Sequence, residues 1–227
     1  MSRGRSSVVL AVVLALAAAG CGGSSSPSTA AASWPVPSPL APGTYTSVAF
    51  KPAVTFTVPA GWEKPDDSAG YLQVRPLGDE VNGVHFFAAP AALSQAANCP
   101  RSAEPNVGTS SIQLIAWIRS LKGLTVGLPG LATIGGLPAT SLDMSIAPGW
   151  TTSCSFANGL PTVPLLFVGA ANLGWVVYGT ERLRLYFVDV PNAGLVVVNL
   201  DSADGVGFEG LLSAAAPVVK SLKLAGG

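Results

Sequence analysis

The sequence predicts an α+β domain, in which an antiparallel β-sheet is flanked by a mid-chain helix and a C-terminal helix. Most segments between residues 43 and 200 alternate apolar and polar side chains with the period of two that is typical of half-buried strands. Only two segments show helical spacing. Because most strands follow one another without a helix between them, the order indicates an antiparallel sheet and not a parallel βαβ series.

The first half of the domain contains four expected strands, at residues 43–50, 54–58, 71–75 and 84–87. The alternation is clearest in the second, where Val54, Phe56 and Val58 share one face. Residues 59–62 are expected to form a turn, and residues 88–108 a long irregular loop. A helix then follows at residues 109–121, capped by Thr109–Ser111 and apolar at Leu114, Trp117, Ile118 and Leu121.

The second half is richer in strands, which are expected at residues 124–126, 132–134, 137–146, 163–168, 173–178, 182–190 and 195–199. The turn at residues 191–194 predicts a hairpin between the last two. Residues 147–162 form a second long loop. The C-terminal helix is expected at residues 208–222, with a kink at Pro217, and residues 221–224 then form a short strand.

The N-terminus has the layout of a secretory signal peptide. Arg3 and Arg5 precede an apolar run from Val8 to Leu16, which is too short to span a bilayer as a permanent helix. Small residues then lead to Cys21, as in a bacterial lipobox, although Ala18 stands where leucine is commonest. We expect residues 1–20 to be a lipoprotein signal peptide and Cys21 to carry a lipid; an ordinary signal peptide is the alternative.

Residues 21–42 are rich in Ser, Pro and Ala and lack apolar periodicity, so they are expected to be a flexible tether. Residues 43–227 are then expected to form a single globular domain. The protein is therefore expected at the cell membrane, lipid-anchored and facing the extracytoplasmic side. Whether Cys21 would carry two or three acyl chains stays open.

Two cysteines remain after Cys21, and an even pair outside the cytoplasm predicts a disulfide between Cys99 and Cys154. Free thiols are the alternative. Metal binding is not expected, because the chain has one histidine and no C-x-x-C motif. Charge is balanced, with 12 Lys and Arg against 12 Asp and Glu, so a nucleic-acid partner is not expected either.

Residues 54–62, Val-Thr-Phe-Thr-Val-Pro-Ala-Gly-Trp, are similar to the F-x-V-P-x-G-W opening of Mog1/PsbP-like domains, which include LpqN-type lipoproteins of actinobacteria. The last helix with its following Ser-Leu-Lys-Leu, and the Gly-Gly-Leu-Pro-Ala turn at residues 135–139, resemble the same family. The resemblance implies an antiparallel sheet sandwiched by helices. The family has no shared catalytic residues, so the resemblance implies none here.

The sequence offers little catalytic chemistry. The only histidine, His85, lies on an expected strand, and a solvated or hydrogen-bonded role is favoured over a catalytic base. No G-x-S-x-G motif is present. Asp143 and Asp189 interrupt alternating strands, and a carboxylate pair formed by them is the basis of the alternative function, a hydrolase of envelope polymer. Asp189 is expected to pair with Arg182 or Arg184, or to cap a turn.

Three tryptophans, Trp62, Trp150 and Trp175, are the candidate contact residues for a ligand or partner, although tryptophans that only cover the sheet edge are the alternative. The leading hypothesis is a non-catalytic, membrane-anchored envelope module without a cofactor. Its partner would be an envelope protein, a glycan or an apolar ligand.

Overall fold

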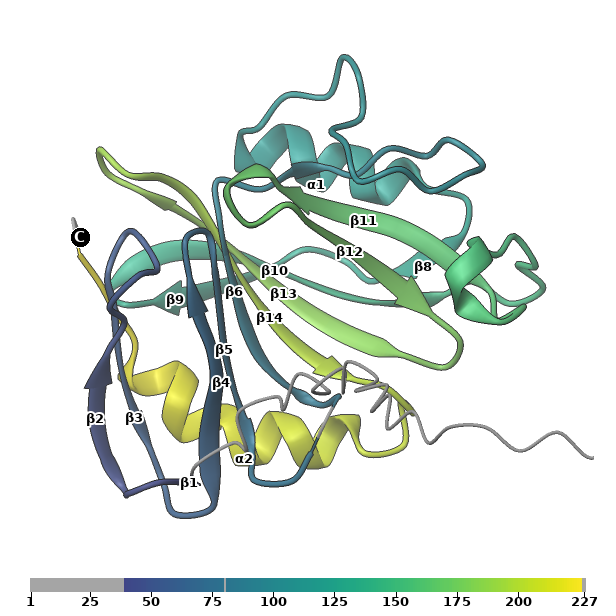
Figure 1. The fold of residues 1–227 in the computed structure, drawn as a ribbon. Coiled ribbons are helices and arrows are strands. Elements are labelled where there is room, and N and C mark those ends of the chain that lie inside the picture. The colour runs from purple at the N-terminus through teal and green to yellow at the C-terminus, as the bar shows by residue number, and fades with distance from the viewer. Residues whose placement is uncertain (1–38, 80, 226–227) are drawn as a thin grey trace, which may run out of the picture. The chain divides into compact units, whose positions relative to one another are not determined.

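The main sheet dominates the computed structural model, which describes residues 39–79 and 81–225, and the α+β class is confirmed (Figure 1). Its strands are β1 (Pro39–Leu40), β4 (Trp62–Ser68), β5 (Tyr71–Pro76), β6 (Gly83–Ala88), β14 (Gly194–Ser202), β13 (Arg182–Val190), β10 (Leu137–Ile146) and β8 (Leu124–Val126), in that spatial order. β9 (Gly130–Ile134) also pairs with β10, and all of these pairings are antiparallel.

Two smaller sheets cover the main sheet. The outer sheet consists of β2 (Gly43–Thr46), β3 (Val54–Val58) and β15 (Lys223–Leu224). The small sheet consists of β7 (Ala91–Ala92), β11 (Thr162–Val168) and β12 (Leu173–Tyr178). Short 3₁₀ turns at η1 (Ser155–Ala157) and η2 (Gly169–Ala171) flank β11.

Each helix packs on one face of the main sheet, together with one smaller sheet (Figure 1). α2 (Phe208–Ser221) and the outer sheet bury Phe86, Val196 and Val198 of the main sheet. α1 (Ser111–Ser120) and the small sheet bury Phe87, Val197 and Leu185, which point to the other face. We call these the α2 face and the α1 face. Successive side chains of a strand point to opposite faces of the sheet. Residues 86 and 87 therefore lie in different hydrophobic cores, as do residues 196 and 197.

Both helices lie where the sequence predicts them. Ser110 is the N-cap of α1, and its side chain accepts a hydrogen bond from the Gln113 amide. Leu114 and Ile118 are fully buried, as their spacing indicates. In α2 the buried residues are Phe208, Leu211, Ala215 and Val218, and the helix continues past Pro217 to Ser221.

The first expected strand, residues 43–50, is shorter in the structure because Asp67 binds the backbone amides of its second half. β2 ends at Thr46, and the amides of Val48, Ala49 and Phe50 donate to the Asp67 carboxylate at 2.8, 3.1 and 3.0 Å. Although burial alone would raise its pKa, the hydrogen bonds from Lys64 and these amides lower the pKa of Asp67 to about 2. The Asp67 carboxylate therefore accepts the hydrogen bonds that a neighbouring strand would otherwise accept from the amides of residues 48–50.

Two further differences concern polar or proline-containing segments. Residues 62–68, where the sequence predicts no strand, form β4, in which Pro65 is tolerated close to the sheet edge. β14 continues past Asn199 to Ser202, because its polar residues are buried in register between β6 and β13.

The described strands begin a few residues before residue 43, where the sequence predicts the end of the tether. Pro39 and Leu40 pair with β4, and Leu40 packs against the core of the α2 face. The expected signal peptide, Cys21 and most of the expected tether lie outside the described residues. Within residues 39–79 and 81–225, no helix is long and apolar enough to cross a membrane.

Candidate functional site

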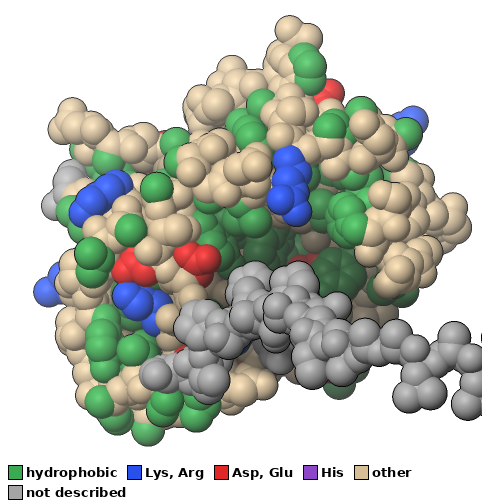
Figure 2. Space-filling view, in the orientation of Figure 1, with side chains coloured by type: hydrophobic (Ala, Val, Ile, Leu, Met, Phe, Trp, Pro, Cys, Tyr) green, Lys and Arg blue, Asp and Glu red, His purple; other side chains and the backbone are tan. Residues whose placement is uncertain are grey.

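A cavity of about 440 Å³ opens on the α1 face, where β12 of the small sheet passes over β5, β6 and β14. The side chains that define it are Tyr71, His85, Asp201, Trp175 and Glu181. Phe156 and Val81, which are 61% and 39% exposed, also line it. Figure 2 shows a hollowed surface whose walls are largely hydrophobic. Pockets of this size and character typically hold small molecules.

The floor of the cavity is a set of polar residues that the sheet register brings together. Gln73, His85 and Asn199 lie opposite one another on β5, β6 and β14, and all three are buried. Along the next register row, Asp201 lies opposite Gly83. A Cβ atom at Gly83 would lie 3.4 Å from His85 Nε2, so the glycine leaves space beside the imidazole. The floor is therefore polar in a face that is otherwise apolar.

Glu181 and Asp201 form an acid pair at this floor. Both residues line the cavity and are only 1% and 2% exposed. Glu181 accepts a hydrogen bond from the Tyr178 amide at 2.8 Å. Burial raises the pKa of both carboxyl groups, and the charge of Asp201 raises the pKa of Glu181 further. The pair therefore retains a proton to a higher pH than ordinary carboxyl groups do.

His85 is hydrogen-bonded, as expected, but it is buried and not solvated. Its Nδ1 atom lies 2.9 Å from the Tyr71 hydroxyl, and its Nε2 atom lies 3.9 Å from Asp201 Oδ2. Burial, with a smaller contribution from the charge of Arg75, lowers the pKa of His85 to about 3, so the imidazole is neutral at physiological pH. We assign the ring proton to Nε2, because the Tyr71 hydroxyl can donate to Nδ1.

Several polar atoms at the cavity lack a partner within the described chain. His85 Nε2, Trp175 Nε1 and Asp201 Oδ1 are buried and neither donate nor accept a hydrogen bond within residues 39–79 and 81–225. Buried polar groups are almost always satisfied, because each unsatisfied one costs about 1–3 kcal/mol. Their concentration at one cavity indicates that a ligand or water completes them.

Aromatic rings form the wall. The Trp175 ring lies 4.6 Å from the His85 ring and 5.3 Å from the Phe87 ring, measured between centroids. Tyr71 stacks on Phe87 at 5.7 Å. These contacts fix the Trp175 side chain of β12 against β5 and β6. They give the cavity an aromatic surface above its acidic floor.

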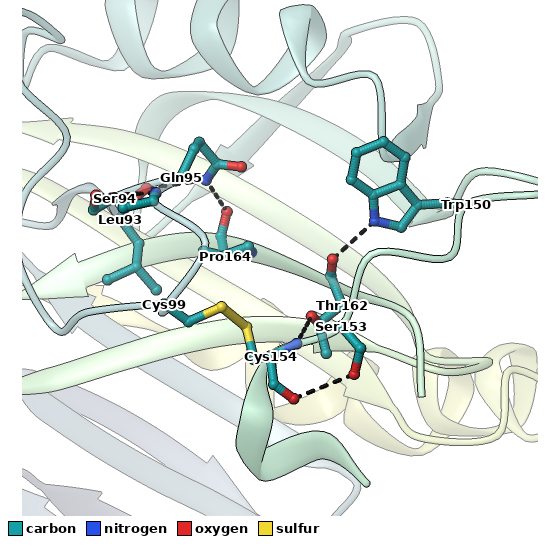
Figure 3. Close-up of a disulfide and its surroundings, with 10 residues drawn as sticks. Leu93, Ser94, Gln95, Cys99, Trp150, Ser153, Cys154, Thr162 and Pro164 are labelled. Atoms are coloured by element: carbon teal, nitrogen blue, oxygen red, sulfur yellow. Dashed lines mark hydrogen bonds between the residues drawn. A yellow bond between two sulfur atoms is a disulfide. The ribbon is translucent and has the colours of Figure 1, made fainter. Parts of the chain in front are cut away.

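The rim depends on the disulfide between Cys99 and Cys154, which confirms the expected pairing (Figure 3). Cys99 lines the cavity, and Phe156 follows Cys154 after one residue. Gln95 Nε2 donates to the carbonyl oxygen of Pro164 on β11, which holds the first loop on the small sheet. The two long loops, which the sequence places far apart, therefore form one side of the cavity.

The three tryptophans have different roles. Trp175 lines the cavity, as a contact residue would. Trp62 is 4% exposed in the core of the α2 face, so its proposed contact role is wrong. Trp150 packs against the core of the α1 face and donates through Nε1 to the Thr162 carbonyl at 2.9 Å (Figure 3). It therefore covers the edge of the small sheet.

The carboxylate pair of Asp143 and Asp189, on which the alternative function depends, does not form. Asp143 pairs with Arg184 on the α2 face through two hydrogen bonds of 2.6 Å. Asp189 is five residues from Arg184 along β13, and it therefore points to the opposite face. There it accepts from Ser111 of α1 at 2.5 Å, and not from Arg182 or Arg184. The basis for a hydrolase that uses these two residues is therefore removed.

The site residues Glu181 and Asp201 were missed in the sequence, where Glu181 looks like a turn residue. A weak signal existed in β14, because Asn199 and Asp201 occupy the positions that continue the apolar face of Leu195 and Val197. Among the described residues, no group of three His, Cys, Asp or Glu side chains is arranged to hold a metal ion.

Some solved structures are similar to this chain in fold. No protein-family model and no curated protein matches the chain. The solution structure of cyanobacterial PsbP (CyanoP) from Synechocystis sp. PCC 6803 is similar, with a TM-score of 0.40 and 12% identity over 80% of this chain and 92% of that chain. At this similarity we infer nothing about function from that protein. The lipoprotein part of the expected resemblance stays a prediction.

Proposed function

We propose that this protein is a non-catalytic binding module of the cell envelope, anchored to the membrane through a lipid on Cys21, and that the cavity beneath β12 holds a small ligand. The observation that supports it most is the group of buried, unpartnered polar atoms of His85, Trp175 and Asp201 at one aromatic cavity. A ligand that supplies partners to these atoms would offset their desolvation.

The composition of the cavity supports a binding role. An aromatic wall with a polar floor is the usual composition of a binding pocket.

The proposal is tested by native mass spectrometry of the purified exported protein. We expect a non-covalent adduct that is lost on denaturation. Val176→Trp, which places a large ring in the cavity, should abolish the adduct. Leu128→Trp is the matched control, because Leu128 is 87% exposed and does not line the cavity. An adduct that persists in Val176→Trp would contradict the assignment to this cavity.

A further inference from the structure

Glu181 and Asp201 are buried without a positively charged partner in the part of the chain that the structure describes. Two other acids of the main sheet have a cationic partner: Arg75 contacts Glu63 at 2.5 Å, and Lys64 contacts Asp67 at 2.8 Å. Glu181 and Asp201 are as buried as Glu63, yet no Lys or Arg in the described residues forms an ion pair with either. The basic side chain that approaches Asp201 is His85, whose imidazole is neutral.

A buried acid without a counter-charge is unfavourable, since desolvation of a carboxylate costs several kcal/mol. If Glu181 and Asp201 served only to fill space in the core, apolar side chains at these two positions would make the fold more stable. The pair instead lines a cavity that is open to solvent at Phe156 and Val81. The missing counter-charge can therefore reach it from outside.

We propose that the cavity binds an organic cation, a protonated amine with an aromatic or aliphatic body, whose ammonium group contacts Glu181 and Asp201. This inference rests on the proposed binding function. The ammonium N–H groups would donate to Asp201 Oδ1 and to the Glu181 carboxyl, which are the acceptors at the floor. The body of the ligand would lie against Trp175 and Tyr71, whose ring faces attract cations and bury apolar surface.

Binding also moves a proton. The empty pair retains a proton to a higher pH than ordinary carboxyls do, and an ammonium that donates to both makes that proton unnecessary. The amine enters with its own proton and the proton of the pair leaves to solvent, so affinity should rise with pH while the amine stays charged. The other titratable or charged groups at or near the pair are Tyr71, Arg75, Asp79, His85, Arg101 and Tyr178. Of these, Arg101 in the disulfide-linked loop is the positively charged residue that lines the cavity. Its side chain lies close to Gly174 of β12.

The test is isothermal titration calorimetry of the purified exported protein with three probes that share a 2-phenylethyl group: 2-phenylethylammonium, 2-phenylethanol and 3-phenylpropionate. We expect the ammonium to bind more tightly than the alcohol by about tenfold or more, and the carboxylate to bind most weakly. Titrations in buffers of different ionisation enthalpy should reveal proton release on binding of the ammonium alone.

Variants identify the contact. Asp201→Asn and Glu181→Gln keep the shape of the side chains and should each reduce affinity for the ammonium about tenfold, with little change for the alcohol. Asp143→Asn, on the opposite face, should bind all three probes as the wild type does. An ammonium affinity that is unchanged in Asp201→Asn, or an alcohol or carboxylate that binds more tightly than the ammonium, would overturn the inference while the pocket itself stands. If none of the three probes binds and no native adduct is found, both this inference and the proposed function are contradicted.

Discussion

Glu181, just before β13, and Asp201, near the end of β14, are both buried and line the floor of one aromatic cavity. They are 20 positions apart in the chain. The β13–β14 hairpin brings their strands together, since Arg182 lies opposite Ser202. Their burial without a cation is the feature on which both the proposed ligand site and its preference depend.

Removal of one acid from this pair should stabilise the fold at neutral and higher pH. The pKa values of both groups are raised above their unfolded values of about 4, so the folded state binds more protons and its stability falls as pH rises above about 4. Glu181→Gln should raise the free energy of unfolding by about 1 kcal/mol or more at about pH 8, and by less at about pH 5. Urea denaturation over this range measures it. Glu209→Gln, at a largely exposed acid, should follow the wild type; an identical profile for Glu181→Gln would contradict the account.

Asp67 should stabilise the turn at residues 47–50. Asp67→Ala leaves the amides of Val48, Ala49 and Phe50 without their acceptor, and we expect a loss of about 1–3 kcal/mol in the free energy of unfolding. The pKa of Asp67 is lowered to about 2, so this contribution is present above about pH 4 and disappears as pH falls toward 2. Asp66→Ala is the control on the other face of β4. Equal losses in both variants would argue against the role assigned to Asp67.

The disulfide should stabilise both the fold and the rim of the cavity. Cys99 and Cys154 are 55 positions apart, and closing a loop of that length contributes about 4 kcal/mol in the chain-entropy model. The double variant Cys99→Ser, Cys154→Ser should therefore unfold at lower urea concentration. It should also lose the native adduct, because Cys99 lines the cavity. An adduct retained at full occupancy would show that the rim is not needed for binding.

Lipid attachment makes a separate prediction that lies outside the described residues. If Cys21 carries the anchor, Cys21→Ala should move the protein from the membrane fraction to the soluble fraction. The variant should still bind the ligand, because the residues that line the cavity all lie between Tyr71 and Asp201. Membrane association that is unchanged in Cys21→Ala would disprove the anchor.

The sequence predicts the helices and most strands well, because the features that determine them are local. The apolar spacing of Leu114 and Ile118 is the face that α1 buries, and the Cys pair follows from its number and its expected compartment. β4 was missed because Pro65 and the acidic residues around it read as a loop, whereas its place between β1 and β5 tolerates them. The site was missed for a different reason. Glu181, Asp201 and His85 lie on three different strands or turns, and only the pairing register brings them to one floor.

The most direct test of the ligand site is the indole N–H resonance of Trp175 in a ¹⁵N-labelled sample, assigned by its loss in Trp175→Phe. Trp150 provides an internal control, because its Nε1 donates to the Thr162 carbonyl and not into the cavity. Titration with 2-phenylethylammonium should shift the Trp175 resonance in a saturable manner and leave the Trp150 resonance in place. A Trp175 resonance that does not move, or that moves only as much as the Trp150 resonance, would contradict the account.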